Sequence, residues 1–133
     1  MSVFIDTSGL LSVLDKDDES HTHAVESWTE ILSSDESLVT TNYIILEMFA
    51  LAQHRFGMKA LKLLQEDVLP ALQVEWIDAA VHAAAVGILF AASRRKLSLV
   101  DCVSFETMRL LKINTAFTLD KHFKEQGFIC IPK

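Results

Sequence analysis

The sequence predicts an α/β fold, a three-layer α/β/α sandwich around a central parallel sheet of about five strands. Two patterns indicate this class. One is a series of short β-branched and aromatic runs, and the other is a series of segments, alternating with those runs, whose apolar residues recur at helical spacing. Strands that alternate with helices join by right-handed crossovers, which give a parallel sheet covered on both faces. The chain has 133 residues, so we expect residues 1–133 to form a single domain.

The strands are predicted where short apolar or β-branched runs lie between turn signals. The first of these runs, Val3-Phe4-Ile5, is followed directly by Asp6. We place the strands at residues 3–5, 38–40, 72–77, 115–118 and 128–131. Ligands of such sheets bind beyond the carboxyl ends of the strands, so the residues after these runs are the first candidates for function.

The helices are predicted from apolar periodicity together with capping residues and breakers. Thr7 or Ser8 is expected to cap a short first helix, and Asn42 is expected to cap a helix that Gly57 ends. We place the helices at residues 10–14, 24–32, 42–55, 60–68, 79–93, 98–112 and 120–126, with Asp78, Ser98 and Asp120 at the starts of the last three.

The longest apolar stretch, Ala79 to Ser93, is shorter than the roughly 20 residues that a bilayer span needs. We therefore expect a buried core helix there and no membrane segment. Trp28, Phe49, Phe90 and Phe105 lie on helical apolar stripes, so they are expected in the core rather than at a base-stacking surface.

The net charge of -6 disfavours a protein that coats nucleic acid, because such binding depends on counterion release by lysine and arginine. It is compatible with an enzyme that holds nucleic acid at one local site. Cys102 and Cys130 are far apart and have no metal-ligand spacing, which is typical of reduced thiols in the cytoplasm. No signal peptide is visible, so a cytoplasmic location is expected.

Four acids fall where the predicted topology directs side chains toward a shared cleft. Asp6 follows the first strand, and Asp120 lies two residues after the fourth. Asp101 is in the first turn of its helix, and Glu47 lies on a helical face that is otherwise apolar. A carboxylate on such a face is costly to bury without a partner.

Each of these acids also has a structural interpretation. Asp6 is compatible with an Asx-turn, Asp101 completes a capping-box pattern with Ser98, and Asp120 is compatible with a helix cap. Glu47 has the weakest structural alternative, because exposure is not expected for its face. The functional hypothesis rests on the conjunction of four acids without a competing cysteine or histidine cluster. Such hard oxygen ligands suit Mg²⁺ or Mn²⁺.

The segments around these acids resemble the four motifs of PIN domains. The similarity covers nearly the whole chain, and its length and motif order fit the VapC-type toxin ribonucleases of bacterial toxin–antitoxin pairs. The four segments are Val3–Ser8, Thr41–Glu47, Leu97–Phe105 and Phe117–Phe123.

The resemblance implies an endoribonuclease that cleaves RNA phosphodiester bonds with Mg²⁺ or Mn²⁺. It implies that Asp6, Glu47 and Asp101 are the core metal ligands, that Asp120 completes the site, and that Thr118 supports it. It also implies a homodimer and a cognate antitoxin that blocks the cleft. A PIN nuclease that processes RNA without an antitoxin is the alternative within the same family.

Basic residues adjoin two of the acidic motifs. Arg94, Arg95 and Lys96 precede the Asp101 motif, and they are candidates for contacts with RNA phosphates or for a solvated loop. Residues that flank Asp120 are candidates for the same role. These are Lys121, His122 and Lys124.

The remaining histidines suggest weaker hypotheses. His21 and His23 form a His-x-His pair, which is too few ligands for a zinc site, so we expect packing or capping at a helix start. His54 follows Glu47 by seven residues and is expected to pack at the helix end.

Other α/β classes that gather acids at a sheet edge fit less well. A receiver-type regulatory module needs a phosphate-accepting Asp after the third strand, but Asp78 is interpreted there as a helix cap. A phosphatase of the haloacid dehalogenase type needs Asp-x-Asp after the first strand, and Asp6-Thr7-Ser8 lacks the second Asp. A non-catalytic binding module is disfavoured by four intact acids.

Overall fold

A computed structural model describes residues 1–133 and contains one sheet of five strands in the order β3-β2-β1-β4-β5. All four neighbouring pairs of strands are parallel. The predicted five-stranded parallel sheet is therefore confirmed. The strands are β1 (Ser2–Ile5), β2 (Ser37–Thr41), β3 (Gln73–Glu75), β4 (Thr115–Phe117) and β5 (Ile129–Ile131).

Helices occupy every connection between consecutive strands. A π-helical turn (Leu64–Val68) and a 3-10 turn (Leu69–Ala71) extend α4 toward β3. None of the helices combines the length and the apolarity that a membrane crossing needs. The helices are α1 (Thr7–Leu14), α2 (His21–Ser33), α3 (Asn42–Phe56), α4 (Met58–Leu63), α5 (Ala79–Ala92), α6 (Leu99–Leu111) and α7 (Lys121–Glu125).

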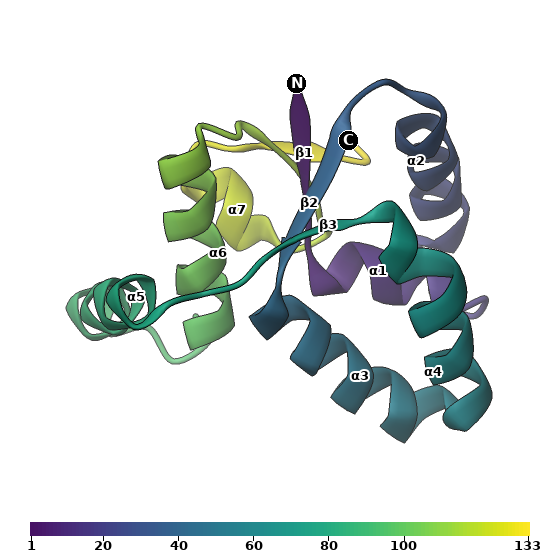
Figure 1. The fold of residues 1–133 in the computed structure, drawn as a ribbon, viewed down its shortest axis with the longest axis horizontal. Coiled ribbons are helices and arrows are strands. Elements are labelled where there is room, and N and C mark those ends of the chain that lie inside the picture. Colours follow the sequence, from purple (N-terminus) through teal and green to yellow (C-terminus); the bar gives the residue numbers. More distant parts are fainter.

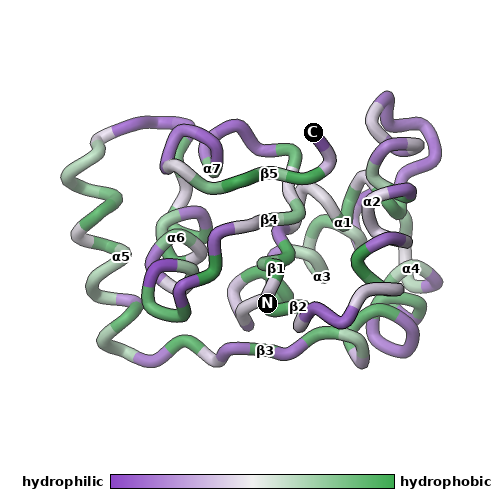
Figure 2. The backbone as a smooth tube through the Cα atoms, turned by 90° about the horizontal axis from the view of Figure 1, so that it is seen from above, coloured by the Kyte–Doolittle hydropathy of each residue, from purple (hydrophilic) through white to green (hydrophobic).

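The helices form two layers, with the sheet between them. In Figure 1, α5 to α7 lie on the left of the sheet and α1 to α4 lie on the right. Figure 2 shows the five strands stacked between the same two groups. The chain adds β2 and β3 on one side of β1 and then returns to add β4 and β5 on the other. Because right-handed crossovers in opposite directions place helices on opposite faces, the order of the strands produces the sandwich.

The point where this direction reverses lies between β1 and β4, and it is the most deeply buried part of the sheet. Phe4, Ile5 and Phe117 are fully buried there. Gly9 of α1 packs directly on β4, since a Cβ atom at this position would lie 2.7 Å from the ring and 2.9 Å from the carbonyl oxygen of Phe117. The missing side chain lets α1 start close to the carboxyl ends of both strands.

Two of the predicted caps are wrong by one residue or more. Asp6, rather than Thr7 or Ser8, is the N-cap of α1. Thr41, rather than Asn42, caps α3, and the Asn42 side chain instead accepts a hydrogen bond from the N–H of Ile77 at 2.8 Å. The cap of α1 is the residue directly after β1, and the cap of α3 is the last residue of β2. The caps Asp78, Ser98 and Asp120 are confirmed.

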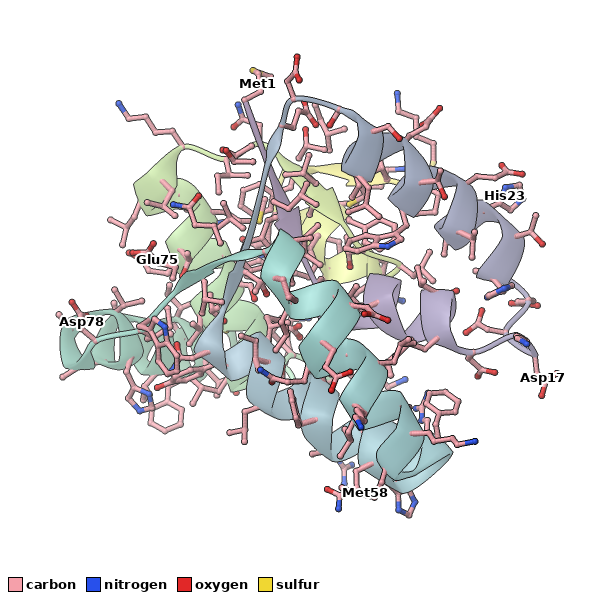
Figure 3. The ribbon with its side chains drawn as sticks, turned by 45° about the vertical axis from the view of Figure 1, so that its right-hand side comes forward. Met1, Asp17, His23, Met58, Glu75 and Asp78 are labelled. Atoms are coloured by element: carbon pink, nitrogen blue, oxygen red, sulfur yellow. The ribbon has the colours of Figure 1, made fainter.

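The α2 helix begins three residues earlier than predicted. The Nδ1 atom of His21 donates to the carbonyl oxygen of Ser12 at 2.8 Å, which ties the start of α2 to α1. The charged loop between these helices projects into solvent, with Asp17 at its tip (Figure 3). His23 is exposed in the first turn of α2, and Ser20 is the N-cap, so the expectation that His23 packs or caps at the helix start is wrong.

The prediction that residues 79–93 form a buried core helix is wrong. The helix exists as α5, but Ala85 is its only buried residue, and Phe90 is 76% exposed. The physical reason is the position of α5, which packs along α6 at the edge of the molecule and has no element on its outer side (Figure 1). Trp28 and Phe105 are in the core as predicted, whereas Phe49 is half-buried.

Candidate metal centre

Asp6 lies where β1 meets β4, and its side chain is only 4% exposed. The apolar residues of β1 stop at this position, and the carboxylate caps α1. The backbone N–H of Asp6 donates to the carbonyl oxygen of Phe117 at 3.1 Å, which joins the ends of the two strands. The carboxylate is thus held at the switch point of the sheet, where ligands of parallel sheets bind.

Two hydroxyl groups hold one oxygen of this carboxylate. The Oδ2 atom of Asp6 accepts from the Ser8 hydroxyl at 2.7 Å and from the Thr118 hydroxyl at 2.8 Å. A hydroxyl group has one hydrogen, so the 3.0 Å contact between these two hydroxyl oxygens carries no proton while both donate to Asp6. The Oδ1 atom takes part in none of these bonds and is available to a cation.

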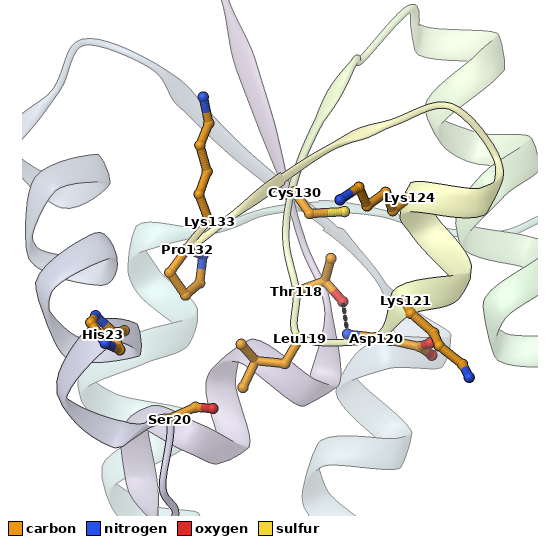
Figure 4. Close-up of a pocket in the computed structure, with 10 residues that line it drawn as sticks. All are labelled: Ser20, His23, Thr118, Leu119, Asp120, Lys121, Lys124, Cys130, Pro132 and Lys133. Carbon is orange, nitrogen blue, oxygen red and sulfur yellow. Dashed lines mark hydrogen bonds between the residues drawn. The ribbon is translucent and has the colours of Figure 1, made fainter.

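The same hydroxyl groups fix the loop after β4. The Thr118 oxygen accepts from the backbone N–H of Asp120 at 3.0 Å, a bond drawn in Figure 4. The Ser8 oxygen accepts from the backbone N–H of Leu119 at 2.9 Å. Through these bonds, the positions of Asp6 and Asp120 are set by one shared network.

Asp101 reaches the same region from the first turn of α6, and it is 8% exposed. Its Oδ2 atom accepts from the N–H of Ser98 at 3.1 Å, while its own N–H donates to the Ser98 hydroxyl at 3.1 Å. The predicted capping box is therefore present. It orients the carboxylate without using all of its lone pairs, so capping is compatible with metal binding.

Asp120 caps α7 and lies beside a buried histidine. Its Oδ1 atom accepts from the backbone N–H of His122 at 2.9 Å, and the Nδ1 atom of His122 lies 2.8 Å from the same oxygen. The second contact is close, but it does not have hydrogen-bond geometry, so Nδ1 has no hydrogen-bond partner. Asp101, Asp120 and His122 each offer one ligand atom, and these three atoms lie within 4.8 Å of one another.

The carboxylates of the centre repel one another in a poorly solvated space. Burial raises the pKa of Asp6 to about 6, with further contributions from the charges of Asp101 and Asp120, although hydrogen bonds from Ser8 and Thr118 oppose the rise. Burial also raises the pKa of Asp101, and the charge of Asp120 adds to it. Clustered carboxylates of this kind are stabilised by a cation. The oxygen donors present fit a divalent ion such as Mg²⁺ or Mn²⁺.

Glu47 lies apart from this cluster. The expectation that its face of α3 is buried is wrong, because Glu47 is half-exposed and Ala50 on the same face is exposed. Glu47 lines a small pocket together with Tyr43 and Val100, and Val100 precedes Asp101. Its side chain therefore lies near the start of α6 and outside the group of Asp101, Asp120 and His122.

The basic residues named from the sequence lie at the surface. Arg94, Arg95 and Lys96 are exposed, and the Arg94 guanidinium forms an ion pair with Glu125 of α7 at 3.0 Å. Lys121 is exposed at the start of α7. His122 is buried, so the expectation that it contacts phosphate like its neighbours is wrong. His54 is exposed at the end of α3 rather than packed.

A pocket of about 320 Å³ opens beside the carboxylates and has a basic character (Figure 4). Thr118 and Asp120 form part of its wall, which connects it to the centre. His23, Lys124 and Lys133 line it from three different segments of the chain, and Lys121 stands at its edge. The pocket places amine groups next to the acidic cluster.

Sequence reasoning missed Ser8 and the position of His122 as parts of the centre. For Ser8 there was a local signal, since a hydroxyl two residues after Asp6 is able to close a short turn with its carboxylate. For His122 there was none, because its burial depends on the packing of α7 against the core. Phe123, the next residue, is fully buried.

Comparison with known proteins gives a consistent result. The family model described as PIN domain matches residues 3–129. The 23S rRNA-specific endonuclease VapC20 of Mycobacterium tuberculosis, from strains CDC 1551 and H37Rv, is 28% identical over 128 residues, which cover 96% of this chain and 95% of that protein.

Two solved structures have the same fold. The crystal structure of Mycobacterium tuberculosis VapC20, described as a sarcin–ricin loop cleaving toxin, superposes with a TM-score of 0.85 at 28% identity, covering 96% of this chain and 97% of that one. FitAcB from Neisseria gonorrhoeae gives a TM-score of 0.69 at 15% identity, covering 96% and 95%, and shows similarity of fold alone.

Proposed function

The chain belongs to the PIN domain family, and from this premise we propose that it is a metal-dependent endoribonuclease, the toxin of a type II toxin–antitoxin pair. The observation that carries the proposal is the grouping of Asp101, Asp120 and His122, whose ligand atoms lie within 4.8 Å of one another, near the buried carboxylate of Asp6. The similarity to VapC20 over nearly the whole of both chains supports the activity. The protein would act in the cytoplasm.

The proposed roles of the acids follow from their surroundings. Asp6, Asp101 and Asp120 would hold the ion, and Glu47 would approach it from α3. A divalent ion, when bound, supplies charge stabilisation and water activation for phosphodiester hydrolysis. The protein fixes Asp6 through Ser8 and Thr118 and excludes bulk water around it, so the carboxylates need little reorganisation during the reaction.

We propose that the basic pocket beside Asp120 receives the RNA backbone. Lys121, Lys124 and Lys133 surround a concave surface next to the carboxylates, and amine groups there would offset the net charge of -6 locally. Arg94, Arg95 and Lys96 would extend this contact along α7. Arg94 would have to leave its ion pair with Glu125 to contact phosphate.

Two exposed apolar surfaces are suited to contacts with protein partners. A groove of about 720 Å³ has Leu46 and Trp76 in its wall, and these side chains are 72% and 74% exposed. We propose that a cognate antitoxin inserts a segment into this concave surface. The outer side of α5, with Phe90 exposed, would meet a second copy across a two-fold axis.

These partner assignments can be tested separately. If α5 forms the dimer interface, Phe90→Glu will be monomeric in light scattering after size exclusion, whereas Met58→Glu will remain dimeric. Met58 is 68% exposed and begins α4, away from α5 (Figure 3). A monomeric parent protein would count against the dimer.

The antitoxin is tested in cells. We expect expression of the protein to arrest growth and co-expression of a neighbouring reading frame to relieve the arrest. Leu46→Asp should abolish that relief.

The activity is tested on purified protein stripped of metal with a chelator. Cleavage of 23S rRNA, mapped by primer extension, should appear only when Mg²⁺ or Mn²⁺ is restored. The sarcin–ricin loop is the first site to examine, because VapC20 is described as cleaving it. Sequencing of RNA ends after induced expression would identify any other substrate. A protein that cleaves no RNA with either ion would contradict the proposal.

A further inference from the structure

His122 is a buried polar residue with a ring nitrogen that forms no hydrogen bond within the protein. The residue is 8% exposed, and its Nδ1 atom is sealed from solvent without a hydrogen-bond partner. Buried nitrogen atoms of this kind nearly always have a partner in native proteins. The position of the atom is specific, since it faces Oδ1 of Asp120 at 2.8 Å.

The contact between Nδ1 of His122 and Oδ1 of Asp120 is short but does not have the geometry of a hydrogen bond. A hydrogen on Nδ1 would not point at the Asp120 oxygen, so no proton joins the two atoms. A ring nitrogen and a carboxylate oxygen that lie this close without a hydrogen bond between them are compatible with two adjacent ligands of one cation. An unprotonated Nδ1 at this distance from a carboxylate oxygen lacks a compensating partner, and a cation bound by both atoms would supply one.

The spacing of the whole group agrees with this interpretation. An ion with ligands at about 2.1 Å holds adjacent ligand atoms about 3 Å apart and opposite ones about 4.2 Å apart. The 2.8 Å separation of Nδ1 and Oδ1 is close to the adjacent value. The ligand atoms of Asp101, Asp120 and His122 lie within 4.8 Å of one another, and this spacing leaves room for one ion with small side-chain adjustments.

We infer that Nδ1 of His122 is a direct ligand of the ion held by Asp101 and Asp120, so that this site has one nitrogen donor among its oxygen donors. The inference rests on the proposed metal-dependent function. Imidazole nitrogen suits transition metals, whereas Mg²⁺ prefers oxygen ligands and water. His122 is therefore a residue that determines metal specificity, and the site prefers Mn²⁺ to Mg²⁺.

A purely positioning role for His122 makes a different prediction. A residue that only orients Asp120 would strengthen the binding of both ions alike. A nitrogen ligand instead favours Mn²⁺ selectively, and it leaves a magnetic coupling between the ion and the ring nitrogen. The two roles are therefore separable without any measurement of catalysis.

The test uses the full chain without RNA. Mn²⁺ binding is followed by electron paramagnetic resonance and calorimetry, with Mg²⁺ as a competitor, for the parent protein, His122→Asn and His54→Asn. His54 is an exposed histidine on α3 and serves as the matched control. We expect His122→Asn to weaken Mn²⁺ binding about 10- to 100-fold and Mg²⁺ binding far less. His54→Asn should change neither.

Electron spin-echo spectra of the Mn²⁺-loaded parent protein should show nitrogen coupling, which His122→Asn removes. This spectrum of the parent protein decides the matter even if the variant does not fold. Absence of nitrogen coupling, or an equal loss of both ions in His122→Asn, would overturn the ligand role. A parent protein that cleaves RNA with Mg²⁺ but does not bind Mn²⁺ would overturn it while leaving the proposed function intact. A protein that binds neither ion and cleaves no RNA would instead contradict the proposed function.

Discussion

The Thr118 hydroxyl donates a 2.8 Å hydrogen bond to the carboxylate of Asp6, joining the residue after β4 to the residue after β1. The same oxygen accepts the N–H of Asp120 at 3.0 Å, so one side chain orients two of the proposed ligands. This bridge spans 112 positions of sequence. It shows how a supporting hydroxyl acts on the centre without being a ligand.

Thr118→Val removes this bridge at nearly constant volume. Because outer partners of metal ligands typically contribute about 10- to 100-fold, we expect RNA cleavage to fall by that factor. Thr118→Ser keeps the hydroxyl and should keep most of the activity. Cleavage rates and Mn²⁺ affinities of the two variants provide the comparison, and equal rates for valine and serine would exclude the proposed support.

The buried carboxylate of Asp6 should make the metal-free protein less stable as pH rises. Its pKa is raised from 3.8 to about 6 in the folded chain, so between these values the folded state binds more protons than the unfolded state. The free energy of unfolding therefore decreases across this window. At about 1.4 kcal/mol per pKa unit, the decrease attributable to Asp6 is about 2 to 3 kcal/mol.

Asp6→Asn removes this titration, and urea denaturation of both proteins at pH 4 and pH 7.5 with a chelator measures it. The variant should gain stability relative to the parent protein as pH rises through the window. Added Mn²⁺ should stabilise the parent protein and have a smaller effect on the variant. Parallel pH profiles for the two metal-free proteins would count against an uncompensated charge at Asp6.

Gly9 and Gly87 form a natural pair for testing the contact between α1 and β4. A Cβ atom at Gly9 would lie 2.7 to 2.9 Å from the ring and the carbonyl oxygen of Phe117, and a backbone atom cannot move aside easily. We expect Gly9→Ala to destabilise the fold by about 1 to 3 kcal/mol. Gly87 has nothing within 4 Å, so Gly87→Ala in α5 should stabilise it by about 0.5 to 1 kcal/mol. Thermal denaturation measures both, and a Gly9→Ala protein as stable as its parent would refute the tight contact.

Charge reversal at the surface should separate two proposed RNA contacts. Lys124 and Lys133 line the pocket beside Asp120, whereas Arg94 and Arg95 lie further along and Arg94 is already paired. In an Asp6→Asn background, which prevents cleavage, both double reversals to Glu should weaken RNA binding. The slope of log affinity against log salt should become shallower by about one for each lost phosphate contact. An unchanged slope for a pair would remove that pair from the interface.

The sheet and its helices were predictable because their signals are local. Apolar runs, capping residues and breakers indicated each element, and the order of strands and helices determined the two layers. The exposure of each element was not predictable in this way, because it depends on packing between segments that are distant in sequence. The α5 sequence has the apolarity of a core helix, yet α5 lies at the edge of the molecule, where only another molecule could cover its outer face.

In the candidate site, too, local signals predicted the positions of residues along the chain, but not their packing. The position of Asp6 followed from the end of one strand, and those of Asp101 and Asp120 followed from helix starts. Glu47 was expected to be buried because its helical face is apolar, but the actual environment depends on how α3 meets α6, and the residue is half-exposed. His122 is a neighbour of Asp120 in sequence, but its unpartnered nitrogen becomes evident only when α7 is packed against the core.

The most direct test of the central claim is cleavage of 23S rRNA by purified Asp6→Asn protein in Mn²⁺ and in Mg²⁺, beside the parent protein. Far-ultraviolet circular dichroism and thermal denaturation establish that the variant is folded. If Asp6 holds the metal ion, the folded variant will lose metal-dependent cleavage by more than about 100-fold, since even outer partners of metal ligands contribute about 10- to 100-fold. A folded variant that cleaves as fast as the parent protein would contradict the account.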